Sequence, residues 1–140
     1  MKILLATDGS KVSLEAAKFV VNHIKELGGK PEIQLVNVQP RLPGRAQAAS
    51  NAGSVRSFYQ EESGKALAGA KKILDQKGIP YAEQFLLGDP GEAIAKHAKA
   101  GGFDMIIMGS HARGTIASTV LGSAVRDVLA DCKVPVLIIR

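Results

Sequence analysis

Glycines and small polar residues are concentrated in the loop from Gly109 to Ser123, which reads GSHARGTIASTVLGS. An uninterrupted apolar run at residues 105–108 precedes this loop and is typical of a strand buried on both faces of a parallel sheet. Apolar residues at helical spacing follow it, at Val125, Val128 and Leu129. A loop between a strand and a helix start offers backbone N–H groups and the positive end of the helix dipole. This order of elements therefore predicts an anion site.

The spacing within the loop resembles the nucleotide loop of the universal stress protein family. That family pattern is glycine, two residues, glycine, nine residues, glycine, then serine or threonine. Here Gly109, Gly122 and Ser123 match the pattern, and Ala112 stands where the second glycine belongs. The resemblance covers essentially all 140 residues. It implies binding of an adenine nucleotide, ATP, which Mg²⁺ could accompany, with Ala112 as the one departure.

The resemblance also implies roles for individual residues. Asp8 matches an aspartate that contacts the nucleoside, and Val38 matches the position at the edge of the adenine. Arg113 lies inside the loop, where its forked guanidinium is suited to phosphate oxygens. The complete set of expected nucleotide-binding residues is Thr7, Asp8, Val38, Met108, Gly109, Ala112, Arg113, Gly122, Ser123 and Ala124.

Four of these residues also have purely structural explanations. Asp8 could close an Asx-turn with the two residues that follow it. Val38 could be a core residue, and Ser123 could cap the last helix instead of binding phosphate. Arg113 could simply be exposed. The sequence leaves these alternatives open.

Apolar segments and turn residues alternate along the chain in a way that predicts five strands separated by helices. Ser10 is a suitable cap for the first helix, and Gly28 and Gly29 are expected to end it. Asp89 and Pro90 predict the start of another helix, after the third expected strand. The strands are expected at residues 2–6, 33–38, within 79–87, at 105–108 and at 134–139. A helix is expected from a capping box at Ser57 and Gln60 to about Lys77.

Alternating strands and helices indicate an α/β fold in one domain, residues 1–140, with a single open parallel sheet and helices on both faces. The resemblance implies a Rossmann-like sheet of five strands in the order 3-2-1-4-5. The segment 41–55 has no periodicity and is long for a connection in a compact domain. We expect it to be mobile or functional, and to lie near the nucleotide site.

Composition excludes several classes of function. The formal charge is +5, but the basic residues are scattered without a basic tract, which argues against nucleic-acid binding. No apolar run approaches the roughly 20 residues of a membrane span, and no targeting segment is visible, so we expect a cytoplasmic protein. The single cysteine, Cys132, has no metal-binding neighbours in the sequence, and no P-loop motif occurs.

We therefore expect an adenine-nucleotide-binding homodimer with a regulatory or protective role, without catalytic residues or a protein metal site. The apolar strand from Pro135 to Ile139 is placed at a sheet edge by the family order and would pair with a second copy. Two alternatives remain within the family: a dimeric interaction protein that binds no nucleotide, and a slow nucleotide hydrolase using Asp8 or His111. A flavodoxin-like redox domain is a further alternative, but aromatic residues to stack a flavin are scarce.

Overall fold

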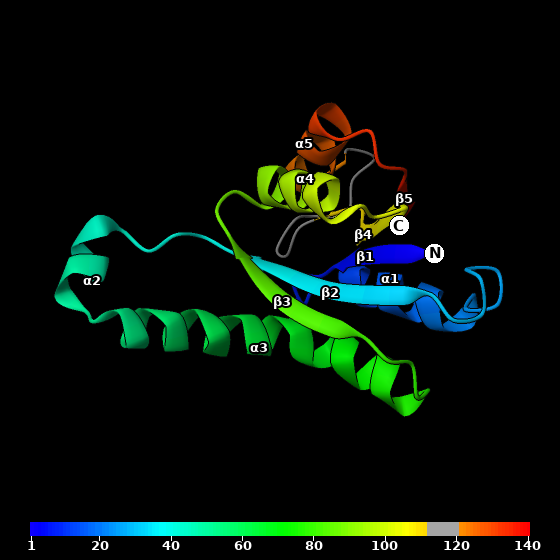
Figure 1. Cartoon of the computed structure of the whole chain (residues 1–140), viewed down its shortest axis with the longest axis horizontal. Coiled ribbons are helices and arrows are strands. Elements are labelled where there is room, and N and C mark those ends of the chain that lie inside the picture. Colours follow the sequence, from blue (N-terminus) through cyan, green and yellow to red (C-terminus); the bar gives the residue numbers. More distant parts are fainter. Residues whose placement is uncertain (112–120) are drawn as a thin grey trace.

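The computed structural model describes residues 1–111 and 121–140. Within these residues the chain alternates strands and helices, as the apolar pattern predicts (Figure 1). The strands are β1 (Lys2–Ala6), β2 (Glu32–Gln39), β3 (Ala82–Leu87), β4 (Met105–Gly109) and β5 (Val136–Ile139). The helices are α1 (Lys11–Asn22), α2 (Gly44–Ala49), α3 (Ala52–Gln76), α4 (Pro90–Gly101) and α5 (Ser123–Asp131).

All five strands are parallel and form one sheet in the order β3-β2-β1-β4-β5. This confirms the expected α/β fold and the strand order. The central strand β1 pairs on both sides, with Leu5 opposite Leu35 of β2 and opposite Ile107 of β4. Parallel neighbours need a crossover helix between them, which explains why a helix follows each of the first four strands.

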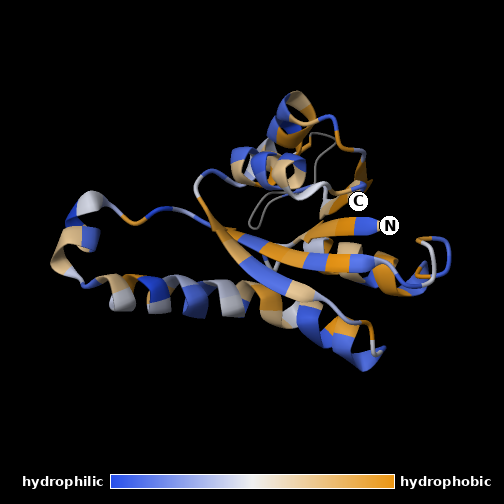
Figure 2. Cartoon of the chain, in the orientation of Figure 1, coloured by the Kyte–Doolittle hydropathy of each residue, from blue (hydrophilic) through white to orange (hydrophobic). Residues whose placement is uncertain are grey.

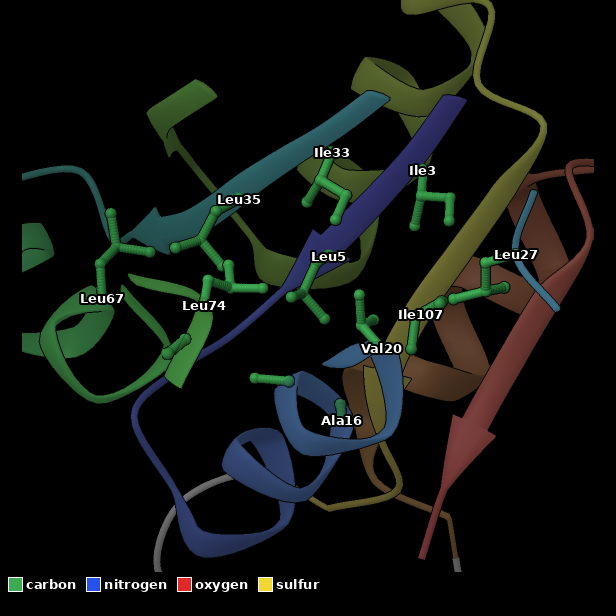
Figure 3. Close-up of a cluster of buried hydrophobic side chains, with 12 residues drawn as sticks. Ile3, Leu5, Ala16, Val20, Leu27, Ile33, Leu35, Leu67, Leu74 and Ile107 are labelled. Carbon is green, nitrogen blue, oxygen red and sulfur yellow. The ribbon is translucent and has the colours of Figure 1, made fainter. Parts of the chain in front are cut away.

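Two layers of apolar side chains hold helices against the two faces of the sheet. On one face, Ile3 and Leu5 pack with α1 and α3 (Figure 3). On the other, Leu4 packs with α4 and α5. Successive side chains of a strand point to opposite faces, so the continuous apolar sequence of β1 supplies both layers. Figure 2 shows apolar residues gathered in the strands.

Local capping chemistry explains where two helices begin. Ser10 accepts a hydrogen bond from the backbone N–H of Ser13 and caps α1. Asp89 caps α4 by accepting from the N–H of Glu92, with Pro90 in the first turn. Both starts agree with the sequence prediction. They fix the direction in which each helix leaves the carboxyl end of its strand.

Two helix boundaries differ from the prediction. The first helix ends at Asn22 instead of continuing to Gly28, although Leu27 is still buried through the turns that follow. The third helix begins at Ala52, capped by Asn51, and not at the proposed Ser57 capping box. Part of the segment predicted to lack structure is thus helical, as α2 and the start of α3.

The outer part of α3 extends beyond the sheet together with α2 (Figure 1). None of the six residues of α2 is buried. The backbone N–H of Leu42 donates to the hydroxyl of Tyr59 at 2.7 Å and ties the connection from β2 to α3. No helix in the described parts of the chain has both the length and the apolarity to cross a membrane.

Candidate functional site

A cavity of about 130 Å³ lies where the carboxyl ends of β1 and β4 meet. The strand order reverses at this point, because β2 follows β1 on one side and β4 adjoins it on the other. Open α/β sheets bind ligands in the crevice at such a switch point. The cavity is lined by residues of β1, β2, β4 and the starts of α1, α4 and α5.

All eight of the predicted site residues that the structure describes line this one cavity. They come from four separate stretches of the sequence and are Thr7, Asp8, Val38, Met108, Gly109, Gly122, Ser123 and Ala124. The other two, Ala112 and Arg113, lie outside the described residues. The predicted positions therefore converge in space, which is a necessary condition for a shared ligand.

Thr7 acts as a scaffold at the end of β1. Its hydroxyl donates to Ser13 Oγ at 2.8 Å, and Ser13 Oγ donates in turn to the carbonyl of Ser10 at 2.9 Å. The Thr7 backbone N–H donates to the carbonyl of Val36 at 2.9 Å. Only 5% of Thr7 is exposed. Its polar groups are occupied in holding the loop against α1 and β2, so they shape the cavity wall.

Asp8 forms the Asx-turn that the sequence suggested as an alternative to ligand binding. Its Oδ1 accepts a hydrogen bond from the N–H of Ser10 at 2.9 Å. Asp8 is half-buried and also lines the cavity. A carboxylate has several acceptor positions on its two oxygens, so the turn and a ligand contact are compatible.

Gly109 is required by packing between a strand and a helix. A Cβ atom at this position would lie 2.9 Å from the backbone N of Ser13, and equally close to Val12. The φ angle of Gly109 is not in the left-handed region. The absence of a side chain therefore lets the first turn of α1 approach the end of β4. It brings the α1 wall and the β4 wall of the cavity together.

The start of α5 forms the third wall. Gly122 is the N-cap residue, and its backbone N–H donates to the carbonyl of Ser110 at 2.8 Å. Ser123 is the first helical residue and gives no side-chain cap, so the capping interpretation of Ser123 is wrong. A helix start that faces a cavity favours anionic groups there through its dipole and its N–H groups. The exposed Ser123 lines the same wall.

Asn37, which the prediction did not include, contributes to the site. Asn37 is buried in β2, and its side-chain amide donates to the backbone carbonyl of Thr7 at 2.9 Å. Its signal in the sequence is a single amide between the apolar residues Val36 and Val38. A polar residue within a buried strand needs a partner, and here the partner is the neighbouring strand end.

His111 lines the cavity beside Gly109. Its Nδ1 lies 2.6 Å from the hydroxyl of Ser110, which is 2% exposed. The backbone N–H of Ser110 donates to the carbonyl of Ile139 and anchors this pair to β5. The hydrogen bond between the Ser110 hydroxyl and Nδ1 holds the imidazole ring at the cavity wall.

Within residues 1–111 and 121–140, no group of three or more histidine, cysteine, aspartate or glutamate side chains is placed to hold a metal ion. The described walls instead combine apolar side chains, such as Val38 and Ile94, with the Asp8 carboxylate and a helix start. This mixture suits a ligand that has an apolar ring at one end and an anionic group at the other.

Comparisons with known proteins agree with this geometry. The model of the universal stress protein family matches residues 1–140. Universal stress protein MJ0531 of Methanocaldococcus jannaschii is 31% identical over 140 residues, covering 99% of this chain and 81% of that protein.

Solved structures share the fold over nearly their whole length. The structure of MJ0577, also from Methanocaldococcus jannaschii, matches with a TM-score of 0.78 and 29% identity, covering 99% of this chain and 94% of that one. A universal stress protein in complex with cAMP matches with a TM-score of 0.73 and 23% identity, covering 100% and 97%. At 23% identity the likeness to the cAMP complex establishes the fold. The family model and the MJ0531 relationship establish more: this chain belongs to the universal stress protein family.

Proposed function

We propose that the cavity at the carboxyl ends of β1 and β4 binds an adenine nucleotide, ATP. The observation that carries this proposal is that eight expected residues, from four separate stretches of the sequence, line one cavity. In this arrangement the adenine packs against Val38 and Ile94, and Asp8 accepts from the ribose hydroxyls. The phosphates lie at the start of α5, near Ser123, where N–H groups and the helix dipole favour negative charge.

The cAMP complex supports an adenine nucleotide as the ligand class, because that protein shares the fold of this chain. The two predicted residues outside the described part, Ala112 and Arg113, remain part of the proposal. Arg113 would pair with phosphate oxygens, and Mg²⁺ could accompany ATP through those oxygens. Ala112 would lower the affinity if its position needs a glycine.

We also propose that the protein forms a homodimer through β5. This strand lies at one end of the sheet and pairs with β4 alone among the described strands. All four of its residues, Val136–Ile139, are half-buried in the single chain. An apolar edge strand that pairs with a second copy across a two-fold axis is protected from aggregation. Light scattering at micromolar concentration tests this, and a strictly monomeric mass would contradict it.

A regulatory or protective role in the cytoplasm, which the family resemblance implies, is part of this proposal. The nucleotide proposal is tested by denaturing the purified protein and identifying released small molecules by mass spectrometry. An adenine nucleotide at close to one molecule per chain supports it. If the released fraction is empty and the protein also fails to take up added ATP, a nucleotide-independent interaction protein becomes the better account.

A further inference from the structure

The described wall of the β1–β4 cavity contains no lysine or arginine. Its one carboxylate belongs to Asp8, and its one side chain that can gain a positive charge belongs to His111. A phosphate monoester carries about −1.5 to −2 charges at pH 7. A phosphate in this cavity is thus repelled by Asp8 and attracted by the start of α5. The charge state of His111 decides whether the described wall also offers a full positive charge.

The neighbouring residue Ser110 places His111 beside the proposed phosphate position. The carbonyl of Ser110 accepts a hydrogen bond of 2.8 Å from the N–H of Gly122, the N-cap residue of α5. The N–H of Ser110 donates to the carbonyl of Ile139 in β5, also at 2.8 Å. His111 therefore directly follows a residue whose backbone is bound to both the start of α5 and the end of β5.

The hydrogen bond between the His111 ring and Ser110 is compatible with both charge states of the ring. Nδ1 of His111 lies 2.6 Å from Oγ of Ser110, which is 2% exposed. A hydroxyl can donate to an unprotonated Nδ1 or accept from a protonated one. The ring can thus gain a proton without losing this bond, and both of its nitrogens are then donors. A positive charge would be held in place at the cavity wall.

Charged groups on the neighbouring elements were compared for their effect on the ring. Asp8, on the loop between β1 and α1, lines the cavity together with His111 and favours a charged ring with or without a ligand. The other charged residues at the ends of the surrounding helices and strands do not line the cavity: Lys11, Asp89, Glu92, Arg126, Asp127 and Arg140. Among the described groups, the charge that differs between the empty and the occupied cavity is therefore that of the ligand itself.

We propose that His111 couples nucleotide binding to the uptake of a proton: the protonated ring pairs with a phosphate oxygen, so the cavity binds its ligand more tightly as the pH falls from 8 to 6. An imidazole changes its charge in this pH range, and a nearby phosphate favours the charged form. Because binding linkage is reciprocal, a ligand that favours proton uptake binds more tightly where protons are more abundant. This inference rests on the nucleotide binding proposed above.

Calorimetric titration of ATP into the full chain at pH 8, 7 and 6 tests the coupling, with His111→Gln measured in parallel. ATP itself gains a proton in this range, but that change is common to both proteins and cancels in the ratio of their affinities. We expect this ratio, wild type over His111→Gln, to rise from within about twofold at pH 8 to about fivefold at pH 6. Titrations in two buffers of different ionisation enthalpy should show greater proton uptake by the wild type.

Two controls separate the phosphate contact from other effects of pH. His23→Gln makes the same change at a ring that does not line the cavity, and its affinity for ATP should stay within about twofold of the wild type at each pH. Adenosine lacks the phosphates. Its affinities for the wild type and for His111→Gln should therefore differ by less than about twofold at pH 8 and at pH 6.

Nuclear magnetic resonance of the three histidine rings gives an independent measurement. On addition of ATP, the midpoint of the pH titration of the His111 ring should move to higher pH. The midpoints of His23 and His97 should not move, because neither ring lines the cavity.

Three results would overturn the proposal and leave the nucleotide site standing. They are an equal pH dependence of ATP affinity in the wild type and His111→Gln, a His111 midpoint that ATP leaves unchanged, and an affinity ratio that changes with pH equally for adenosine. If ATP binds at no pH, the proposed nucleotide site itself fails, and the proton coupling fails with it.

Discussion

The side-chain amide of Asn37 donates a hydrogen bond of 2.9 Å to the backbone carbonyl oxygen of Thr7, and both residues are buried. Together with the bond from the Thr7 N–H to the Val36 carbonyl, it fixes the carboxyl end of β1 against β2. The loop that carries Asp8 begins at this point. These two hydrogen bonds, one of them from a buried amide, thus set the position of Asp8 relative to Val38.

We expect Asn37→Ala to lower the free energy of unfolding by about 1–3 kcal/mol, because the buried Thr7 carbonyl loses this partner. Gln39→Ala is the control. Its side chain donates to Asn37 Oδ1 at 2.7 Å in a partly buried position, and its loss should cost less. Urea unfolding measures both. If both changes lowered the free energy of unfolding equally, the hydrogen bond from Asn37 to the Thr7 carbonyl would not be the cause of the loss.

Gly109→Ala should destabilise the fold by about 1–3 kcal/mol, as overpacking of a close contact does. The added methyl group would meet the backbone of Val12 and Ser13 at 2.9 Å and push α1 away from β4. The same shift widens the proposed nucleotide site, so affinity for ATP should fall as well.

Gly64→Ala provides the matched control for Gly109→Ala, because an added Cβ atom in α3 meets nothing within 4 Å. That change should raise stability by roughly 0.5–1 kcal/mol through helix propensity. Thermal unfolding of both variants separates the two cases. A harmless Gly109→Ala would mean that α1 moves without cost.

Ser123→Ala should lower the affinity for ATP several-fold and change the free energy of unfolding by less than about 0.5 kcal/mol. The reason is that Ser123 is not a cap, so its hydroxyl does not support α5. Ser10→Ala is the comparison variant. Because Ser10 caps α1, this change should lower the free energy of unfolding by about 1 kcal/mol. A large loss of stability in Ser123→Ala would contradict this prediction and show that the Ser123 side chain stabilises the fold.

Stability should fall as the pH decreases below about 6.5, through His97. Burial lowers the pKa of His97 below its ordinary value of 6.5, and the positive charge of Lys2 acts in the same direction. The unfolded chain therefore binds a proton before the folded chain does. The neutral ring therefore contributes its full share of the free energy of unfolding above pH 6.5. This contribution is lost as the pH falls toward the pKa of His97 in the folded state.

Thermal unfolding between pH 5 and 8 checks the His97 prediction. In that pH range, His97→Gln should make the unfolding temperature less dependent on pH. His23→Gln should leave that pH dependence as it is in the wild type. The ring of His97 lies on α4 with its Nε2 2.8 Å from Gln34 Oε1, so its environment belongs to the fold and not to the proposed nucleotide site. An unchanged slope in His97→Gln would assign the dependence to other groups.

Local chemistry made some elements predictable from the sequence. Asp89 and Pro90 specify a helix start through neighbouring atoms alone, and the structure confirms it. The strand order could not be predicted from periodicity, because parallel strands that pair are separated in the sequence by crossover connections. It came from the family resemblance, whose residues also identified eight of the cavity-lining positions.

The errors have equally specific causes. The exposed helix α2 buries no residue, so the sequence has no apolar period there to reveal it. Leu27 continues the apolar spacing of α1 although the helix has ended, because the turns after Asn22 still pack on the core. The role of Asn37 depends on a contact with Thr7, 30 residues away, which no local pattern encodes.

The most direct test of the proposed function is calorimetric titration of ATP into the full wild-type chain, with Ala112→Gly measured alongside. The account predicts saturable binding with one site per chain, strengthened several-fold by Ala112→Gly if an L-residue is strained at that position. If Ala112→Gly leaves a tight affinity unchanged, the alanine has no adverse effect, and the nucleotide site stands. If neither protein binds ATP, the central claim is contradicted, and the cavity at the ends of β1 and β4 does not serve as a nucleotide site.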